Sequence, residues 1–497
     1  MEKISLPINQ TSQNLSQRNL GVRNLCCIFA TMNQQDTIIA LATPSGMGAI
    51  AVIRISGDQS IQSVDKVFRS IHQKKLSDQK SHTVHLGHLY QESRVLDQVL
   101  VTVFKNPHSY TGEDVVEISC HGSVYVQQQI LQLFVSNGVR LADAGEFTLR
   151  AFLNGKMDLS QAEAVADLIA SENQGAHQIA MQQMRGGFSN HLKNLREELL
   201  HFASMIELEL DFSEEDVAFA DMDTFYELVL KIKGILQNLL DSFSTGNVLK
   251  NGVPVAIAGK PNAGKSSLLN ALLNENKAIV SDIAGTTRDS IEDTLIIDGI
   301  AYRFIDTAGL RETSNTIEAI GVERAKDHIS NARILLYLYD QLDTTPEEIL
   351  ADLATFQRKE LTIILVQNKC DLLGGYFEND FTKKLNALGR NRYSSTIMAI
   401  STMDTKSLGA LKSVLSEELN SKPSAGNTIV SNSRHFELLN HALKSIVLVQ
   451  EGLEAKISGD LLAIDLRETI HHLGEITGEI TTDDLLGNIF SSFCIGK

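Results

Sequence analysis

The chain has 497 residues, a formal net charge of −17, 43% hydrophobic residues and 21% charged residues. This length exceeds what one hydrophobic core supports, so we expect about two to four domains in a soluble globular protein, with no apolar run long enough to span a bilayer. The acidic balance argues against a generally basic nucleic-acid binder, although a local patch could still bind RNA.

Residues 1–31 are rich in Asn, Gln, Ser and Leu and contain Glu2 as their one acidic residue. They are interpreted as a disordered extension, or as the result of a start codon placed too early, with the true start at Met32. The alternative is a mitochondrial transit peptide, because acidic residues are scarce and Arg18 and Arg23 are present.

Cysteine usage indicates a reducing compartment. The five cysteines form no CxxC pair and no zinc spacing, so we expect a cytoplasmic protein without structural metal. The terminal Cys494-Ile495-Gly496-Lys497 is similar to a prenylation box, but its glycine and its lysine do not fit that motif, so we expect no lipidation and no membrane anchor.

Residues 32–152 predict a small α/β domain. A helix is expected over 124–137, and strands over 37–42, 49–56, 99–104 and 115–119. Cys120 and His121 are neighbours on the last strand, so they point to opposite faces and form no thiol–imidazole pair.

Helical periodicity follows over 153–250 and returns over 421–497 after a linker at 421–426. Two apolar stripes are expected to be bundle core: Leu192, Leu195, Leu199, Phe202, Met205 and Ile206 in the first part, and Leu462, Leu466, Ile470, Leu473 and Ile476 in the second. The acidic cluster at 211–216 is interpreted as a solvated loop rather than a metal site. An α/β domain at 251–420 therefore interrupts a helical bundle, which makes the fold class multidomain, part α/β and part all-α.

The strand-like segment Val253–Ala258 leads into Gly259-Lys260-Pro261-Asn262-Ala263-Gly264-Lys265 and then a helix from Ser266. This is the G-x-x-x-x-G-K-[ST] phosphate loop in its required strand–loop–helix context. Glycines let backbone N–H groups approach phosphate oxygens, and the helix N-terminus favours anions. Lys265 is expected to reach the β- and γ-phosphates, and the Ser266 hydroxyl to ligate Mg²⁺.

Further nucleotide motifs follow in order. A hairpin with its turn at Asp298-Gly299 delivers Asp306-Thr307-Ala308-Gly309, where Asp306 is expected to hold a Mg²⁺-bound water and Gly309 to sense the γ-phosphate. The preceding loop has a threonine hydroxyl that can close on Mg²⁺ and runs Ser281, Asp282, Ile283, Ala284, Gly285, Thr286, Thr287.

Guanine selection is expected at the end of the next strands. In Asn368-Lys369-Cys370-Asp371, the Asp371 carboxylate can accept from both N1–H and N2–H₂ of guanine, donors that adenine lacks. Ser401-Thr402 ends the following strand near the base. Ala263, Gly264 and Ser267 complete the expected contacts, and five motifs in this order predict GTP hydrolysis. Leu310 follows the D-x-x-G turn where small GTPases carry a water-orienting glutamine, so another polar group and another positive charge must act.

The whole resembles the MnmE (TrmE) family of tRNA-modification GTPases. The resemblance runs from about Asp36 to the last residue and is carried by G-K-P-N-A-G-K-S, D-I-A-G-T-T-R-D, D-T-A-G-L-R-E, the segment G-E-F-T-L-R-A-F-L-N-G-K-M-D and the terminal F-C-I-G-K. It implies an N-terminal folate-binding domain, a helical domain and an inserted Ras-like domain. It further implies a homodimer that works with the FAD-binding partner MnmG on C5 of the wobble uridine (U34) of tRNA, installing aminomethyl or carboxymethylaminomethyl groups.

The resemblance also assigns residues. It implies 5-formyltetrahydrofolate, or a related one-carbon donor, on Arg54, Glu117, Lys156 and Lys497. It implies K⁺ on Asn262, Ser281, Ile283 and Thr286, Mg²⁺ on Ser266 and Thr287, and a catalytic acid at Glu318. By themselves Arg54 and Glu117 would be a structural ion pair, Lys497 a solvated tail residue and Glu318 an exposed helix charge.

Two positions depart from the family pattern: Thr402 stands where the family has alanine, and Ser281 replaces a common threonine. The alternative function is a GTPase switch, for example in ribosome assembly, without a part in modification chemistry. Folate binding, or loss of wobble-uridine modification in a deletion strain, distinguishes the two.

Overall fold

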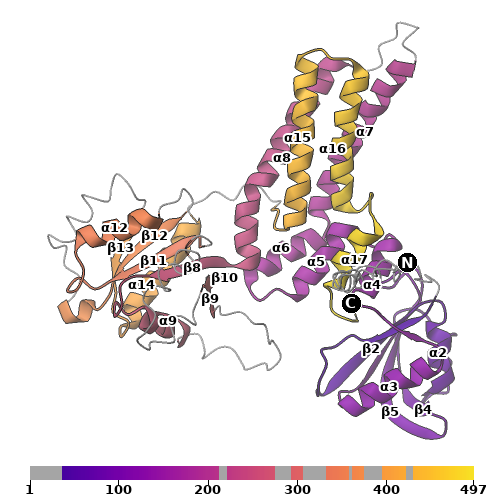
Figure 1. Cartoon of the computed structure of the whole chain (residues 1–497). Coiled ribbons are helices and arrows are strands. Elements are labelled where there is room, and N and C mark those ends of the chain that lie inside the picture. Colours follow the sequence, from indigo (N-terminus) through magenta and orange to yellow (C-terminus); the bar gives the residue numbers. More distant parts are fainter. Residues whose placement is uncertain are drawn as a thin grey trace, which may run out of the picture. The chain divides into compact units, whose positions relative to one another are not determined.

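The computed structural model describes residues 36–211, 221–274, 293–305, 329, 332–356, 361–373, 395–420 and 429–496. They fall into two compact units (Figure 1). The first unit holds the described residues up to 166, 183–225 and 448–496, and the second holds 167–182 and 226–447. None of the helices in these ranges is long and apolar enough to cross a membrane.

A seven-stranded sheet forms the amino-terminal part of the first unit, in the order β3-β4-β5-β6-β2-β1-β7. Its neighbours are antiparallel except for the parallel pair β1–β7. The strands are β1 (Ile38–Leu41), β2 (Ile50–Ser56), β3 (Phe68–Ser70), β4 (Thr83–Gln91), β5 (Arg94–Phe104), β6 (Val115–His121) and β7 (Arg140–Leu141). The strand pattern predicted from the sequence is confirmed, but β3, β4 and β7 were not expected.

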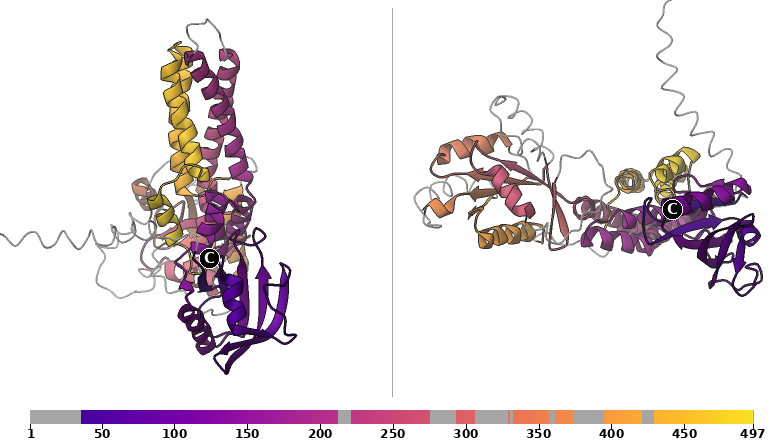
Figure 2. Two further views of the ribbon diagram at one scale, coloured as in Figure 1. Left: turned by 90° about the vertical axis from the view of Figure 1, so that its right-hand side faces the viewer. Right: turned by 90° about the horizontal axis from the view of Figure 1, so that it is seen from below.

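Helices α2 (Ser60–Val67) and α3 (Val124–Ser136) cover one face of this sheet (Figure 2). Ile53 and Ile118 point toward the helices and are fully buried in the core between the layers. Alternation then places Arg54 and Glu117, which pair across β2 and β6, on the opposite face. Cys120 is buried while its neighbour His121 is exposed, as the alternation predicts.

The first unit also contains the long helices α7 (Gly187–Asp211) and α16 (Gly459–Thr477), which pack side by side. Both predicted stripes lie in this packing: Phe202 and Met205 are half-buried, and the other nine residues are buried. Shorter helices α4 (Glu146–Leu153), α17 (Asp483–Ser491) and the first part of α5 (Leu159–Ile169) share a small core around Leu149, Leu159 and Phe490. The predicted acidic loop at 211–216 lies outside the residues whose side chains are described.

The second unit is built on a six-stranded sheet in the order β13-β12-β11-β8-β10-β9. Its strands are β8 (Val253–Ala258), β9 (Asp293–Ile297), β10 (Ile300–Phe304), β11 (Ile334–Tyr339), β12 (Thr362–Gln367) and β13 (Ser395–Ala399). All neighbours are parallel except the hairpin β9–β10. Asp298 and Gly299 both have positive φ, at 48° and 80°, which confirms the predicted hairpin turn.

Helices cover both faces of this sheet. The core of one face includes α9 (Lys265–Asn274) and α14 (Thr405–Asn420), and that of the other includes α12 (Pro346–Phe356). The described residues also form α6 (Gln174–Met184), α8 (Met222–Asn251) and α15 (Ser433–Glu454), and a 3₁₀ turn spans Cys370–Leu373. The result is a Ras-like α/β domain whose parallel strands β8, β11, β12 and β13 end at one edge, where open α/β sheets bind ligands.

Candidate functional site

The phosphate loop between β8 and α9 is held in a shape that only small residues permit. Gly259 has φ +141°, and a Cβ there would stand 2.0 Å from the carbonyl oxygen of Leu338. Gly264 has φ +96°, and a Cβ there would stand 2.1 Å from Nδ2 of Asn368. Asn262 adopts φ 65°, a conformation that asparagine tolerates better than most residues. The loop therefore packs tightly against the Leu338 backbone and the Asn368 side chain, where a larger residue than glycine would clash.

The Lys265 side chain folds back onto the backbone of this loop. Its ammonium group donates to the carbonyl oxygens of Gly259 at 2.8 Å and Lys260 at 2.9 Å. Burial lowers the pKa of Lys265, because it removes water from around the charged ammonium group. The side chain thus lies along the cradle, and Ser266 and Ser267 follow it in the first turn of α9. The helix N-terminus and the lysine together make an anion site.

The segment Asn368–Asp371 is held against this loop. The buried Asn368 donates from Nδ2 to the carbonyl oxygen of Ala263 at 2.8 Å, and its backbone N–H donates to Tyr339 at 2.9 Å. The Cys370 N–H donates to the carbonyl oxygen of Ile400 at 3.2 Å. Asp371 follows with an exposed side chain. The structure thus brings the predicted base-reading residues and the predicted phosphate loop together.

Ser401 and Thr402 lie beside this segment at the end of β13. Ser401 is buried and Thr402 is half-buried. Ser407 fixes the Ser401 backbone twice: its hydroxyl accepts from the Ser401 N–H at 3.1 Å and donates to the Ser401 carbonyl at 2.9 Å. These bonds hold the backbone of the turn next to Asp371 in place, which suits a contact from backbone groups to a base. Such a contact does not depend on the side chain at position 402, where this chain has threonine and the family has alanine.

Several predicted site residues lie outside the described residues. They are Ser281, Asp282, Ile283, Ala284, Gly285, Thr286, Thr287, Asp306, Thr307, Ala308, Gly309, Glu318 and Lys497. The described part of β10 runs parallel to β8, with Phe304 opposite Val255, so the chain leaves β10 toward the phosphate-loop edge. The roles predicted for these residues remain predictions.

In the first unit, the predicted folate residues Arg54 and Glu117 form an ion pair. Nε and Nη2 of Arg54 donate to Oε1 of Glu117 at 2.9 Å and 2.7 Å. The guanidinium lies over the rings of Tyr110 and Phe147, 5.2 Å and 5.7 Å from their centroids. Both of these bonds use Oε1 of Glu117, so the ion pair holds the carboxylate in one orientation. A carboxylate held this way can accept from the paired N–H donors of a pterin-like ring.

Of the other two predicted folate residues, Lys156 is described by the structure and Lys497 is not. Nζ of the exposed Lys156 donates to the carbonyl oxygen of Pro107 at 2.9 Å, in the loop that carries Tyr110. At the C-terminus, Ile495 bridges Ala144, and a Cβ on Gly496 would stand 2.2 Å from the carbonyl oxygen of Leu41. Leu41 belongs to β1 and pairs with Ile53, the neighbour of Arg54 on β2, so the described C-terminal residues lie against the strand next to that of Arg54.

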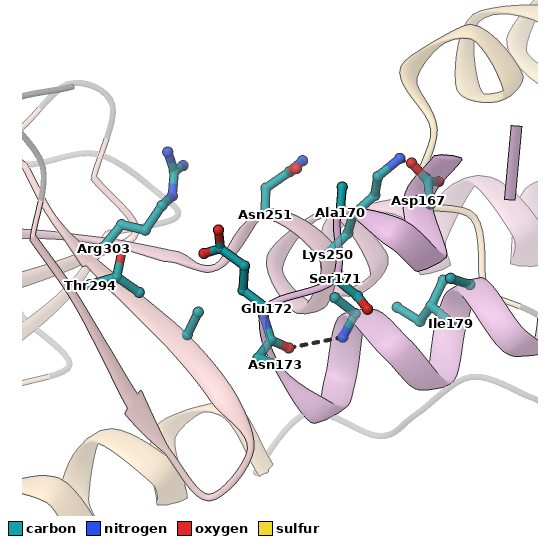
Figure 3. Close-up of a pocket in the computed structure, with 13 residues that line it drawn as sticks. Asp167, Ala170, Ser171, Glu172, Asn173, Ile179, Lys250, Asn251, Thr294 and Arg303 are labelled. Carbon is teal, nitrogen blue, oxygen red and sulfur yellow. Dashed lines mark hydrogen bonds and ion pairs between the residues drawn. The ribbon is translucent and has the colours of Figure 1, made fainter. Parts of the chain in front are cut away.

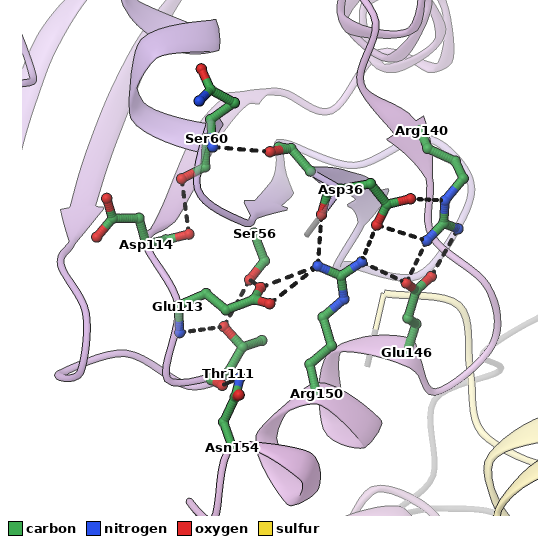
Figure 4. A network of polar contacts seen from close by, with 12 residues as sticks. Asp36, Ser56, Ser60, Thr111, Glu113, Asp114, Arg140, Glu146, Arg150 and Asn154 are labelled. Atoms are coloured by element: carbon green, nitrogen blue, oxygen red, sulfur yellow. Dashed lines mark hydrogen bonds and ion pairs between the residues drawn. The ribbon is translucent and has the colours of Figure 1, made fainter. Parts of the chain in front are cut away.

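A buried charge network supports this region (Figure 4). Arg150, 7% exposed, donates to Asp36 at 2.6 Å, to Glu146 at 2.9 Å and to Glu113 at 3.2 Å. Arg140 binds Asp36 and Glu146 from the other side, at 2.6 Å each. Burial opposes the charge on Asp36, but hydrogen bonds from both arginines outweigh it and lower its pKa. The network ties α4 to the start of β1.

Sequence reasoning did not single out this network. Glu146 and Arg150 stand four residues apart in G-E-F-T-L-R, a spacing that puts them on one helix face and could have indicated an ion pair.

A cavity of about 250 Å³ lies elsewhere in the second unit (Figure 3). Its lining includes the ion pair Asp167–Lys250, at 2.7 Å, with Glu172, Asn173 and Arg303. Lys250 precedes β8, and Arg303 pairs with Pro254 at the start of that strand. The cavity is therefore at the opposite edge of the sheet from the phosphate loop and is not part of the nucleotide site.

Comparison with known proteins places the chain in a family. Residues 37–156 match the family model "GTP-binding protein TrmE N-terminus", and residues 159–494 match "MnmE helical domain". The tRNA modification GTPase MnmE of Flavobacterium johnsoniae is 54% identical over 471 residues, which cover 94% of this chain and 100% of that protein. Its counterparts in Christiangramia forsetii and Bacteroides fragilis (strain YCH46) are 54% and 52% identical, covering 94% and 93% of this chain and 100% of theirs. With two family models across most of its length and half its residues shared with full-length relatives, this chain belongs to the MnmE (TrmE) family of tRNA modification GTPases.

Proposed function

We propose that this chain is the GTP-hydrolysing subunit that modifies C5 of the wobble uridine of tRNA together with a FAD-dependent partner, MnmG. The observation that carries the proposal is the contact between the phosphate loop and Asn368. The Asn368 side chain packs against Gly264 and donates to the carbonyl oxygen of Ala263, so the predicted phosphate-binding and guanine-binding segments are close enough to bind the same nucleotide.

GTP is expected to bind with its phosphates on the loop 259–266. Backbone N–H groups of the loop and the N-terminus of α9 face the anion, and Lys265 exchanges its carbonyl partners for β- and γ-phosphate oxygens. The lowered pKa of Lys265 fits this exchange, because a partly desolvated ammonium gains more from an anionic partner than a hydrated one does.

Metal ions are expected at the same place. Ser266 and Thr287 would hold Mg²⁺, and Asn262 with Ser281, Ile283 and Thr286 would hold K⁺. When bound, these cations would neutralise charge that develops on the transferred phosphoryl group. The positive φ of Asn262 and its place in the first half of the loop support a ligand role, because its exposed side chain is free to turn toward the phosphates.

Hydrolysis needs a group that orients water, because Leu310 cannot do so. We assign that role to Glu318. The test measures GTP turnover in KCl and in NaCl for the wild type and for Glu318→Ala. We expect turnover to be much faster in K⁺ than in Na⁺. We also expect two GTPase domains to dock in the presence of GDP and aluminium fluoride. Glu318→Ala is expected to lose nearly all turnover while it retains GTP binding. Equal rates in the two salts would refute the K⁺ role, and normal turnover in the variant would refute the acid.

A folate one-carbon donor, 5-formyltetrahydrofolate or a relative, is proposed to bind at Arg54, Glu117, Lys156 and Lys497. The Arg54–Glu117 ion pair, the guanidinium of Arg54 over two aromatic rings and the approach of Gly496 to β1 support this. We also propose a homodimer. The exposed side chains of Leu86 and Leu100, which pair across β4 and β5 on the face away from α2 and α3, suit a second copy of the chain.

The test of the tRNA role is the nucleoside composition of tRNA from cells that lack the chain. Loss of the C5-modified wobble uridine supports the proposal, and an unchanged composition refutes it.

A further inference from the structure

Asp340 belongs to none of the nucleotide motifs, yet it stands at the centre of the nucleotide edge. It follows β11 directly, and β11 lies between β8, which leads to the phosphate loop, and β12, which leads to Asn368. Asp340 is only 6% exposed. A buried carboxylate at this place needs partners that repay its desolvation.

Both oxygens of this carboxylate are engaged. Oδ2 accepts from Nζ of Lys369 at 2.9 Å, and Oδ1 accepts from the backbone N–H of Leu342 at 3.0 Å. The Asp343 N–H donates to the Asp340 carbonyl at 3.1 Å and closes the turn. Burial opposes its charge, but the Lys369 hydrogen bond and the Leu342 N–H outweigh that effect and lower the pKa of Asp340. The carboxylate is therefore fixed by its own turn and fixes the lysine in its place.

Lys369 has an unusual backbone. Its φ is 60°, in the left-handed region that few lysines occupy. Its neighbours are tied on both sides, Asn368 to Ala263 and Cys370 to Ile400. Only its side chain retains the freedom of four rotatable bonds, and ordering a lysine side chain costs rotamer entropy. The hydrogen bond to Asp340 orders the Lys369 side chain before a nucleotide binds, so binding does not have to order it.

We propose that Asp340 is a positioning residue for guanine-nucleotide binding. It neutralises the Lys369 ammonium and aims the side chain, so that the apolar stem of Lys369 is presented to the base beside Asp371. Lys369 then contributes through its ordered stem rather than through charge on the phosphates. The inference rests on the proposed nucleotide role of Asn368–Asp371.

The experiment measures release of a fluorescent GDP analogue from the full-length chain by stopped flow. A hydrogen bond to a charged group contributes about 1.5–3 kcal/mol, and about 1.4 kcal/mol is tenfold, so Asp340→Asn is expected to release GDP about tenfold faster or more. Asp343→Asn is the matched control. It removes the same charge from an exposed side chain in the same turn and is expected to release GDP at the wild-type rate.

A double variant distinguishes a role of Asp340 in positioning Lys369 from a role in stabilising the fold alone. If Asp340 acts through Lys369, then Lys369→Met alone also speeds release, and adding Asp340→Asn to it changes the rate less than about twofold. Asp340→Glu is expected to restore part of the slow release. Wild-type release in Asp340→Asn or in Lys369→Met would overturn the proposal, as would additive effects in the double variant.

Lys369→Met keeps the test decisive should Asp340 variants fail to fold, because Lys369 is partly exposed. Failure of the underlying site is distinguishable: Asp371→Asn with unchanged preference for GTP refutes the guanine assignment itself.

Discussion

Substitution of Gly264 by alanine tests the contact between the phosphate loop and Asn368 at the nucleotide site. Gly264 has φ +96°, and a Cβ would stand 2.1 Å from the Nδ2 of Asn368, well inside any allowed contact. Asn368 cannot retreat freely, since that nitrogen donates to Ala263 at 2.8 Å. The added methyl group therefore strains the loop backbone and breaks the bond that joins the loop to the guanine segment.

The size of the effect follows from these two terms. A left-handed backbone costs a residue with a Cβ about 1–2 kcal/mol. Loss of the buried Asn368 hydrogen bond costs about 1–3 kcal/mol more, because its donor or acceptor remains buried. If the free loop relaxes to avoid this cost, binding must restore the loop, and the combined cost of about 2–5 kcal/mol corresponds to a GTP affinity weaker by about 30-fold or more.

The assay is a fluorescence titration with a labelled guanine nucleotide, together with thermal unfolding. Gly409→Ala is the matched control. Gly409 lies in α14, and its Cβ would meet nothing within 4 Å, so alanine there should leave affinity unchanged and raise stability by up to about 1 kcal/mol. An affinity of Gly264→Ala within threefold of the wild type would refute the reasoning.

Three further predictions concern single side chains. Asp371→Asn should lose GTP affinity and gain affinity for xanthosine triphosphate, whose carbonyl accepts from the new amide; a variant that still prefers GTP in competition titrations contradicts the base assignment. Glu117→Gln should weaken 5-formyltetrahydrofolate binding in calorimetry without changing GTP affinity, and equal folate affinity would remove Glu117 from the site. Asp36→Asn should lower the melting temperature at pH 7. Because the pKa of Asp36 is lowered in the fold from its ordinary 3.8, this difference should shrink as the pH falls below about 3.8; a difference that persists there would mean that charge pairing with Arg140 and Arg150 is not its cause.

The phosphate loop and the guanine segment could be predicted from the sequence because their chemistry is local. A glycine loop between a strand and a helix has few shapes, and parallel strands bring their ends to one edge. Asp371 and Lys265 therefore lie where their motifs indicate. The apolar stripes of α7 and α16 are also predictable, because helical periodicity reports burial directly.

Long-range polar partners were not predictable in the same way. The pairing of Asp340 with Lys369 joins residues 29 positions apart, and that of Arg150 with Asp36 joins residues 114 positions apart. No periodicity marks such pairs, because they depend on how the strands are ordered. The short strand β3 and the polar strand β4 were missed for a similar reason: alternation over few apolar residues gives a weak signal.

We expect wobble-uridine modification to require GTP binding and hydrolysis by this chain. Mass spectrometry of tRNA nucleosides can test this requirement in a deletion strain that carries either the wild-type chain or its Lys265→Ala variant at matched expression. We predict that the wild type restores the C5-modified wobble uridine and that the variant leaves it unmodified. Full modification with the variant, or unmodified tRNA with the wild type, would show that nucleotide binding and hydrolysis by this chain are not required.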